Sequence, residues 1–140
     1  MKVVGFHNRT IIRNTICDMI AVREQLDNPH SLEGYYLPLE SGADFAYLAF
    51  MSSIDSVRER LPLYRDVLQS VTMPSIIVWG AQDTTLDGTE AIPLFASDLH
   101  IPSDDVEMLA DAKHLIMEER PGLIADRVDA FVRRGDGGRN

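Results

Sequence analysis

Apolar residues in the first part of the chain recur at intervals of three and four, which is the spacing of one face of an α-helix. The first such stripe consists of Ile11, Ile12, Thr15, Ile16, Met19 and Ile20. Asn8, just ahead of the stripe, is a residue type favoured at helix N-caps. The pattern therefore predicts a helix from about Arg9 to Leu26.

Three more helical segments follow before residue 72. A short one begins at Asn28-Pro29, and Ser41 to Asp44 resembles a capping box that opens the apolar stretch from Phe45 to Met51. The aromatic and methionine side chains of that stretch either belong to a core or line a pocket. The last apolar stripe is spaced by three and four residues and consists of Val57, Leu61, Tyr64, Leu68 and Val71. Pro62 lies within this segment and predicts a kink or a split in the helix.

The pattern changes after Pro74. Residues 76–79 form a short, continuous apolar run that Gly80 ends, as expected of a parallel strand covered on both faces. A helix from Thr89 to about Leu99, a strand over 106–109 and a helix over 121–134 complete a parallel α/β unit. Because two parallel strands rarely stand alone, residues 2–6 are a candidate third strand, and residues 135–140 read as a flexible polar tail.

Composition narrows the class of protein. The chain has 140 residues, 45% of them hydrophobic, and a formal charge of −9. This predicts one globular domain, or part of a larger one, that repels nucleic acid. No apolar run has the roughly 18 residues of a membrane span. No secretory signal is recognisable, so we expect a cytoplasmic protein. Cys17, the only cysteine, has no partner for a disulfide and fits a small buried apolar position.

Two polar residues follow the two predicted strands and are candidates for catalysis. Asp83 comes after the first strand and His114 after the second, 114 − 83 = 31 residues later. A loop, a crossover helix and a strand fit that interval, so both side chains can meet at one sheet edge. Asp87 and, less strongly, Asp111 are alternatives to Asp83 as the acidic partner of His114. His114 and Glu118 lack a second histidine for a zinc site, and no glycine-rich nucleotide loop is present, so we expect neither a metal nor a cofactor.

Several motifs in the second half occur in the order and spacing of a known fold. They are Met73 to Asp83, His100-Ile101-Pro102, Asp111-Ala112-Lys113-His114-Leu115, Glu119-Arg120-Pro121 and Val128-Asp129-Ala130-Phe131-Val132. This half resembles the C-terminal part of a cap-bearing α/β-hydrolase. The resemblance implies a partial α/β-hydrolase fold, in which two or three parallel strands are flanked by helices. Residues 1–72 would form a helical cap, with a strand stub in 1–6, and residues 73–134 the end of the core domain.

The resemblance also implies roles for the two candidates: His114 would be the general base and acid, and Asp83 would orient it. The third member of such a triad is missing, because no two glycines bracket a nucleophile as the strand-to-helix elbow Gly-x-Ser-x-Gly requires. We therefore expect a hydrolase by descent that is inactive as an isolated chain. Its complete form would cleave a small ester or a related carbon–carbon, epoxide or haloalkane substrate.

A second reading stays open, in which the chain is a non-catalytic module that dimerises or binds a ligand. In either reading the exposed sheet edge would receive the partner. That partner is a second copy of the chain or a complementing N-terminal half.

Overall fold

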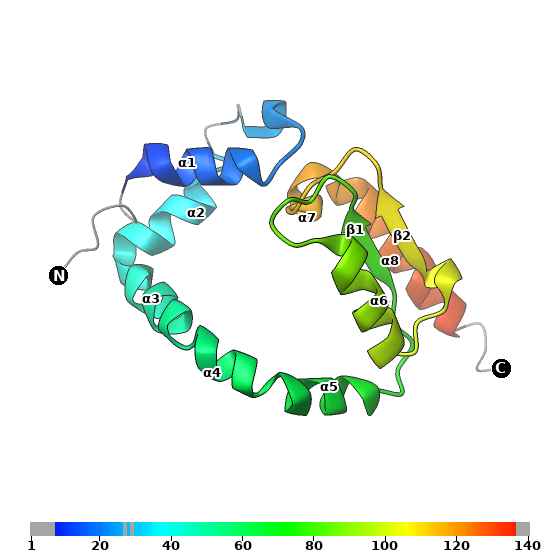
Figure 1. Ribbon diagram of the computed structural model, residues 1–140. Helices are drawn as coiled ribbons and strands as arrows, with labels where there is room; N and C mark the ends of the chain where they lie inside the picture. The colour runs from blue at the N-terminus through cyan, green and yellow to red at the C-terminus, as the bar shows by residue number, and fades with distance from the viewer. Residues whose placement is uncertain (1–7, 27, 29, 137–140) are drawn as a thin grey trace. The chain divides into compact units, whose positions relative to one another are not determined.

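The computed structural model describes residues 8–26, 28 and 30–136, which form a mostly helical chain with one short parallel sheet (Figure 1). Its regular elements are α1 (Arg9–Asp18), α2 (Glu33–Pro38), α3 (Asp44–Ser52), α4 (Ile54–Glu59), α5 (Leu61–Gln69), β1 (Ile77–Gly80), α6 (Gly88–Asp98), β2 (Val106–Leu109), α7 (Ile116–Glu119) and α8 (Pro121–Asp136). Short 3₁₀ turns lie at Arg23–Leu26 and Ser103–Asp105. No helix in this part of the chain is long and apolar enough to cross a membrane.

The chain divides into two compact units. Of the described residues, those within Met1–Asp18 and Arg23–Tyr64 form the helical unit, and those within Met19–Val22 and Arg65–Asn140 form the sheet unit. The sheet unit thus includes four residues from early in the chain as well as the end of α5. The assignment of residues 1–72 to a cap and 73–134 to a hydrolase core stays a prediction.

The sheet consists of β1 and β2, which run parallel, with Ile77 opposite Val106 and Gly80 opposite Leu109. The helix α6 connects them, and α8 follows. The expected arrangement of short parallel strands flanked by helices is confirmed. The candidate third strand, residues 2–6, lies outside the described residues.

Helices α6 and α8 cover opposite faces of the strand pair (Figure 1). The indole of Trp79 lies against Gly88 at the start of α6. Glu107, the register partner of Val78, accepts a hydrogen bond from Arg127 of α8 at 2.6 Å. Because successive side chains of a strand point to opposite faces, Trp79 and Val78 mark the two covered faces.

The predicted helix over residues 9–26 is wrong in its second half. Helix α1 ends at Asp18, and residues 23–26 form a separate 3₁₀ turn. Between them, the backbone of Met19 accepts hydrogen bonds from the N–H groups of His114 and Leu115. A continuous helix would have used that carbonyl internally, so tertiary hydrogen bonds outweigh the local pattern here.

The helical unit begins with α1 packed on α2. Ile16, Cys17 and Tyr36 are buried, and the guanidinium of Arg9 lies 4.7 Å from the centre of the Tyr36 ring. Arg9 also bonds Glu33 at 2.8 Å and Glu40 at 2.7 Å. The burial of Cys17 confirms its predicted place as a small core residue.

Two predictions for the middle of the chain have different outcomes. The capping box at Ser41 to Asp44 is wrong, because Ala43 precedes α3 and no side chain caps the helix there. Instead the backbone kinks at Gly42, whose φ of 101° lies in the left-handed region that favours glycine. The split near Pro62 is confirmed, since α4 ends at Glu59 and α5 begins one residue before the proline.

The apolar helix α3 is largely exposed in the described chain. Phe45 is 67% exposed and Phe50 58%, and the only buried residue of the helix is Asp44. Within the helical unit, these aromatic side chains therefore do not form a core. At the other end, α8 extends to Asp136, so the first two residues of the predicted tail are helical and 137–140 lie outside the described residues.

Candidate functional site

The first loop of the site follows β1 and holds Asp83 rigidly. One carboxylate oxygen, Oδ1, accepts hydrogen bonds from the backbone N–H groups of Thr85 at 2.8 Å and Leu86 at 3.1 Å. The backbone N–H of Asp83 in turn bonds the carbonyl of Gly80 at 3.1 Å. An aspartate that accepts from residues two and three positions on forms a tight turn, and this turn fixes the direction of the other oxygen, Oδ2.

The second loop follows β2 and is tied directly to the first. Gln82 donates its backbone N–H to the carbonyl of Ala112 at 2.9 Å and its side-chain amide to that of Ala110 at 2.9 Å. The loops approach so closely at Gly80 that a Cβ added there would lie 1.9 Å from the carbonyl oxygen of Lys113. Only glycine fits this position, so the glycine that ends the predicted strand also sets the separation of the two loops.

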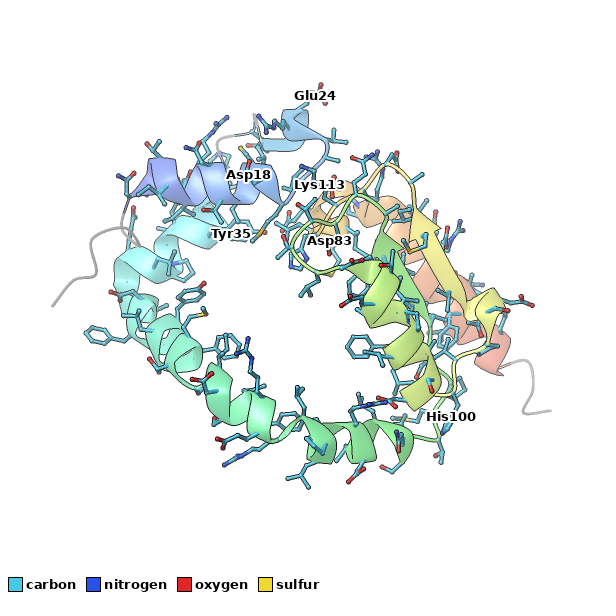
Figure 2. All side chains as sticks on the ribbon, in the orientation of Figure 1. Asp18, Glu24, Tyr35, Asp83, His100 and Lys113 are labelled. Carbon is cyan, nitrogen blue, oxygen red and sulfur yellow. The ribbon has the colours of Figure 1, made fainter. Side chains whose placement is uncertain are left out.

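These loops bring Asp83 and His114 into contact. Nδ1 of His114 lies 2.9 Å from Oδ2 of Asp83. The Asp83 side chain is only 4% exposed, whereas that of His114 is 28% exposed, so the acid is covered and the imidazole reaches the surface. Figure 2 shows Asp83 and Lys113 together beyond the C-terminal ends of the strands, with His100 at the opposite end.

The environment of Asp83 keeps it ionised. Burial alone would raise its pKa, but the hydrogen bonds from His114 and from the backbone of Leu86 and Thr85 outweigh burial and lower the pKa below its usual value of 3.8. An ionised carboxylate can only accept hydrogen bonds, so the proton of a neutral His114 lies on Nδ1. That tautomer leaves a lone pair on Nε2, which makes no hydrogen bond within the described residues.

The rival acids have other partners. Asp87 is the N-cap of α6 and accepts from the backbone N–H of Thr89 at 2.8 Å and from its hydroxyl at 2.7 Å. Those bonds lower the pKa of Asp87. Asp111 pairs with Arg120. Of the three candidate acids, Asp83 alone hydrogen-bonds His114.

One residue of the site was not predicted as a site residue from the sequence. Glu119 is 1% exposed, and its carboxylate accepts from the backbone N–H of Lys113 at 2.7 Å and of Ala21 at 2.6 Å. In the sequence, the motif Glu119-Arg120-Pro121 was the signal that could have identified Glu119 as a site residue. A glutamate at the end of a short helix is usually exposed, however, so the pattern alone does not predict its burial.

No grouping of three or more histidine, cysteine, aspartate or glutamate side chains that could hold a metal ion occurs in residues 8–26, 28 and 30–136. Glu118 is exposed and precedes the buried Glu119 in α7. The contact between His114 and Asp83 itself offers proton transfer by an imidazole that a buried carboxylate orients.

Comparisons of the chain with protein-family profiles, curated proteins and solved structures found no match. The relationship to α/β-hydrolases that the motifs predict thus stays a prediction. The contact between Asp83 and His114 is the observation on which an interpretation of the site depends.

Proposed function

We propose that this chain carries the acid–base half of a hydrolytic site of the α/β-hydrolase type. The single observation that carries the proposal is the 2.9 Å hydrogen bond between Nδ1 of His114 and the covered carboxylate of Asp83. Both residues lie in loops that follow the C-terminal ends of parallel strands, which is where ligands bind in open α/β sheets.

The geometry supports one sequence of proton transfers. Nε2 of His114 takes the proton of a nucleophile's O–H or S–H group as that group attacks a carbonyl carbon. The imidazolium that results is stabilised by the ionised Asp83 across the Nδ1–H bond, and the same proton then passes from Nε2 to the leaving group. In this scheme Asp83 orients and stabilises the ring, and its own carboxylate stays unprotonated.

The nucleophile must come from a polypeptide segment outside these 140 residues, because the sequence has no glycine-flanked elbow. Removing a nucleophile from a hydrolytic triad leaves only what binding and the oxyanion hole supply. The isolated chain is therefore nearly inert toward the small ester or related substrate of the complete site.

The outer edge of β1 is where such a segment would join. Within the described residues β1 pairs with β2 alone, so its other edge presents unpaired backbone groups. Both faces of the strand pair are already covered by helices, which leaves edge pairing as the way to extend the sheet. A strand of the nucleophile-bearing segment, placed beside β1, would bring an elbow to the same end of the sheet as Asp83 and His114.

Co-expression of the chain with the polypeptide encoded immediately upstream of it tests the proposal. A fluorophosphonate probe labels serine nucleophiles that a histidine activates, so we expect labelling of the upstream polypeptide only when this chain is present. His114→Ala should abolish labelling, and His30→Ala, an exposed histidine outside the site, should leave it unchanged. An upstream polypeptide without an elbow, or labelling that survives His114→Ala, would overturn the proposal in favour of the non-catalytic module.

A further inference from the structure

Glu119 is an ionisable side chain placed where burial is costly. Its side chain is 1% exposed, making it one of the two largest fully buried side chains of the described chain. A buried carboxylate is tolerated only when its oxygens are satisfied by hydrogen bonds or by charge. Here both oxygens accept from backbone donors: Oε1 from Lys113 and Oε2 from Ala21, with Val22 also in reach of Oε2 at 3.4 Å.

These bonds connect two distant parts of the chain at the residue before His114. Lys113 directly precedes the histidine, while Ala21 lies 98 residues before Glu119. The connection is made in both directions, because the carbonyl of Met19 accepts from the backbone N–H groups of His114 at 3.1 Å and Leu115 at 3.2 Å. The His114 loop is thus fastened to the segment Met19–Val22 on either side of the histidine.

We propose that Glu119 is a positioning residue for His114. Its carboxylate fixes the backbone at Lys113, so that Nδ1 of the imidazole stays aligned with Oδ2 of Asp83. This inference rests on the proposed function of the Asp83–His114 pair. The segment Met19–Val22 has the same positioning role, since it anchors the carboxylate of Glu119 and binds the backbone of His114.

The role requires a carboxylate rather than any hydrogen-bonding side chain. The donors from Lys113 and Ala21 approach different oxygens, so the residue must accept at both ends. A glutamine has the same shape but only one oxygen, and in either orientation its NH₂ group would face one of the two N–H donors. Glu119→Gln therefore breaks one link of the two without changing side-chain size.

The experiment compares ¹⁵N-imidazole NMR spectra and amide hydrogen exchange of the whole chain with those of three variants. In Glu119→Gln we expect His114 to become a mixture of both tautomers. The backbone amide of Lys113 or Ala21, whichever loses its acceptor, should exchange roughly tenfold faster, the effect of losing a hydrogen bond to a charged group. In Asp83→Asn the Nδ1–H tautomer should be lost as well. Glu59→Gln, which removes the same charge from an exposed residue of α4, should match the unsubstituted chain in both readouts.

The variants separate the two claims. If Asp83→Asn leaves the tautomer of His114 unchanged, the acid–base pair fails and the proposed function fails with it. If Asp83→Asn has its expected effect but Glu119→Gln leaves both tautomer and exchange unchanged, only the positioning role is overturned. A general loosening of the fold would accelerate exchange in α6 and α8 too, so rapid exchange confined to the neighbourhood of Lys113 or Ala21 is the supporting result.

A measurement on the unsubstituted chain decides the matter should Glu119→Gln fail to fold. The amide protons of Lys113 and Ala21 should both be protected from exchange, because each is bonded to the buried carboxylate of Glu119. Unprotected amides at these two positions would overturn the proposal without any variant.

Discussion

The sheet unit and the helical unit use their side chains differently. In the sheet unit, Asp83, Asp98 and Glu119 are covered carboxylates with defined donors, and each ties together segments that are far apart in sequence. In the helical unit, α3 leaves Phe45 and Phe50 more than half exposed. The difference indicates that the unit with the candidate site buries carboxylates in specific polar bonds, whereas the helical unit has an apolar surface on α3 that the unit itself does not cover.

Asp98 extends the comparison beyond the site. It is 3% exposed at the end of α6 and accepts from Arg65 at 2.7 and 2.9 Å and from Gln69 at 2.8 Å. The hydrogen bonds from Arg65 and Gln69 lower the pKa of Asp98 to about 2. The end of α5 is thus fastened to α6 by an ion pair, and this explains why residues 65–69 belong to the sheet unit.

The largest effect should come from Gly80→Ala. The new Cβ would lie 1.9 Å from the carbonyl oxygen of Lys113 and 2.7 Å from that of Ala112, and both are backbone atoms that cannot move aside without separating the loops. We expect a loss of more than about 4 kcal/mol in the free energy of unfolding, measured by urea denaturation. Gly122→Ala is the matched control, because nothing lies within 4 Å of a Cβ there; it should stabilise α8 slightly. Equal stability of the two variants would show that the loops are not in close contact.

Truncating one large side chain in each unit should give the next largest effect. Ile20 is 1% exposed in the sheet unit, so Ile20→Ala should cost about 3 kcal/mol through lost burial and the cavity left behind. Phe50 is 58% exposed in the helical unit, so Phe50→Ala should change stability by less than about 0.5 kcal/mol. Thermal denaturation measures both. A large loss in Phe50→Ala would mean that α3 is covered, which contradicts the contrast between the units.

A smaller, pH-dependent effect should follow from Asp83→Asn. The pKa of Asp83 is lowered from 3.8, so the folded state binds this proton more weakly than the unfolded state. The stability that the carboxylate contributes is therefore complete above its unfolded pKa and is lost as the pH falls through its folded pKa. We expect the variant to be less stable by about 1–2 kcal/mol near pH 7 and the difference to shrink below about pH 4. Urea titrations at several pH values check this, and a difference that stays constant down to pH 2 would contradict it.

Much of the second half could be predicted from the sequence because its signals are local. The apolar run before Gly80, the strand over 106–109 and the positions of Asp83 and His114 after them require only residues that are neighbours in the chain. The segment Met19–Val22 could not be predicted, because its partner Glu119 lies about a hundred residues away and its own pattern continues that of α1. For the same reason the sequence pattern does not predict the burial of Glu119, which depends on that segment.

The most direct test of the central claim is the ¹⁵N-imidazole spectrum of the neutral His114 ring in the unsubstituted chain. The account predicts a proton on Nδ1, bonded to Asp83, and an unprotonated Nε2. Free imidazoles favour the opposite tautomer, so this result would require a hydrogen-bond acceptor at Nδ1, the position that Asp83 occupies. A predominantly Nε2-protonated ring would contradict the acid–base pair and with it the proposed function.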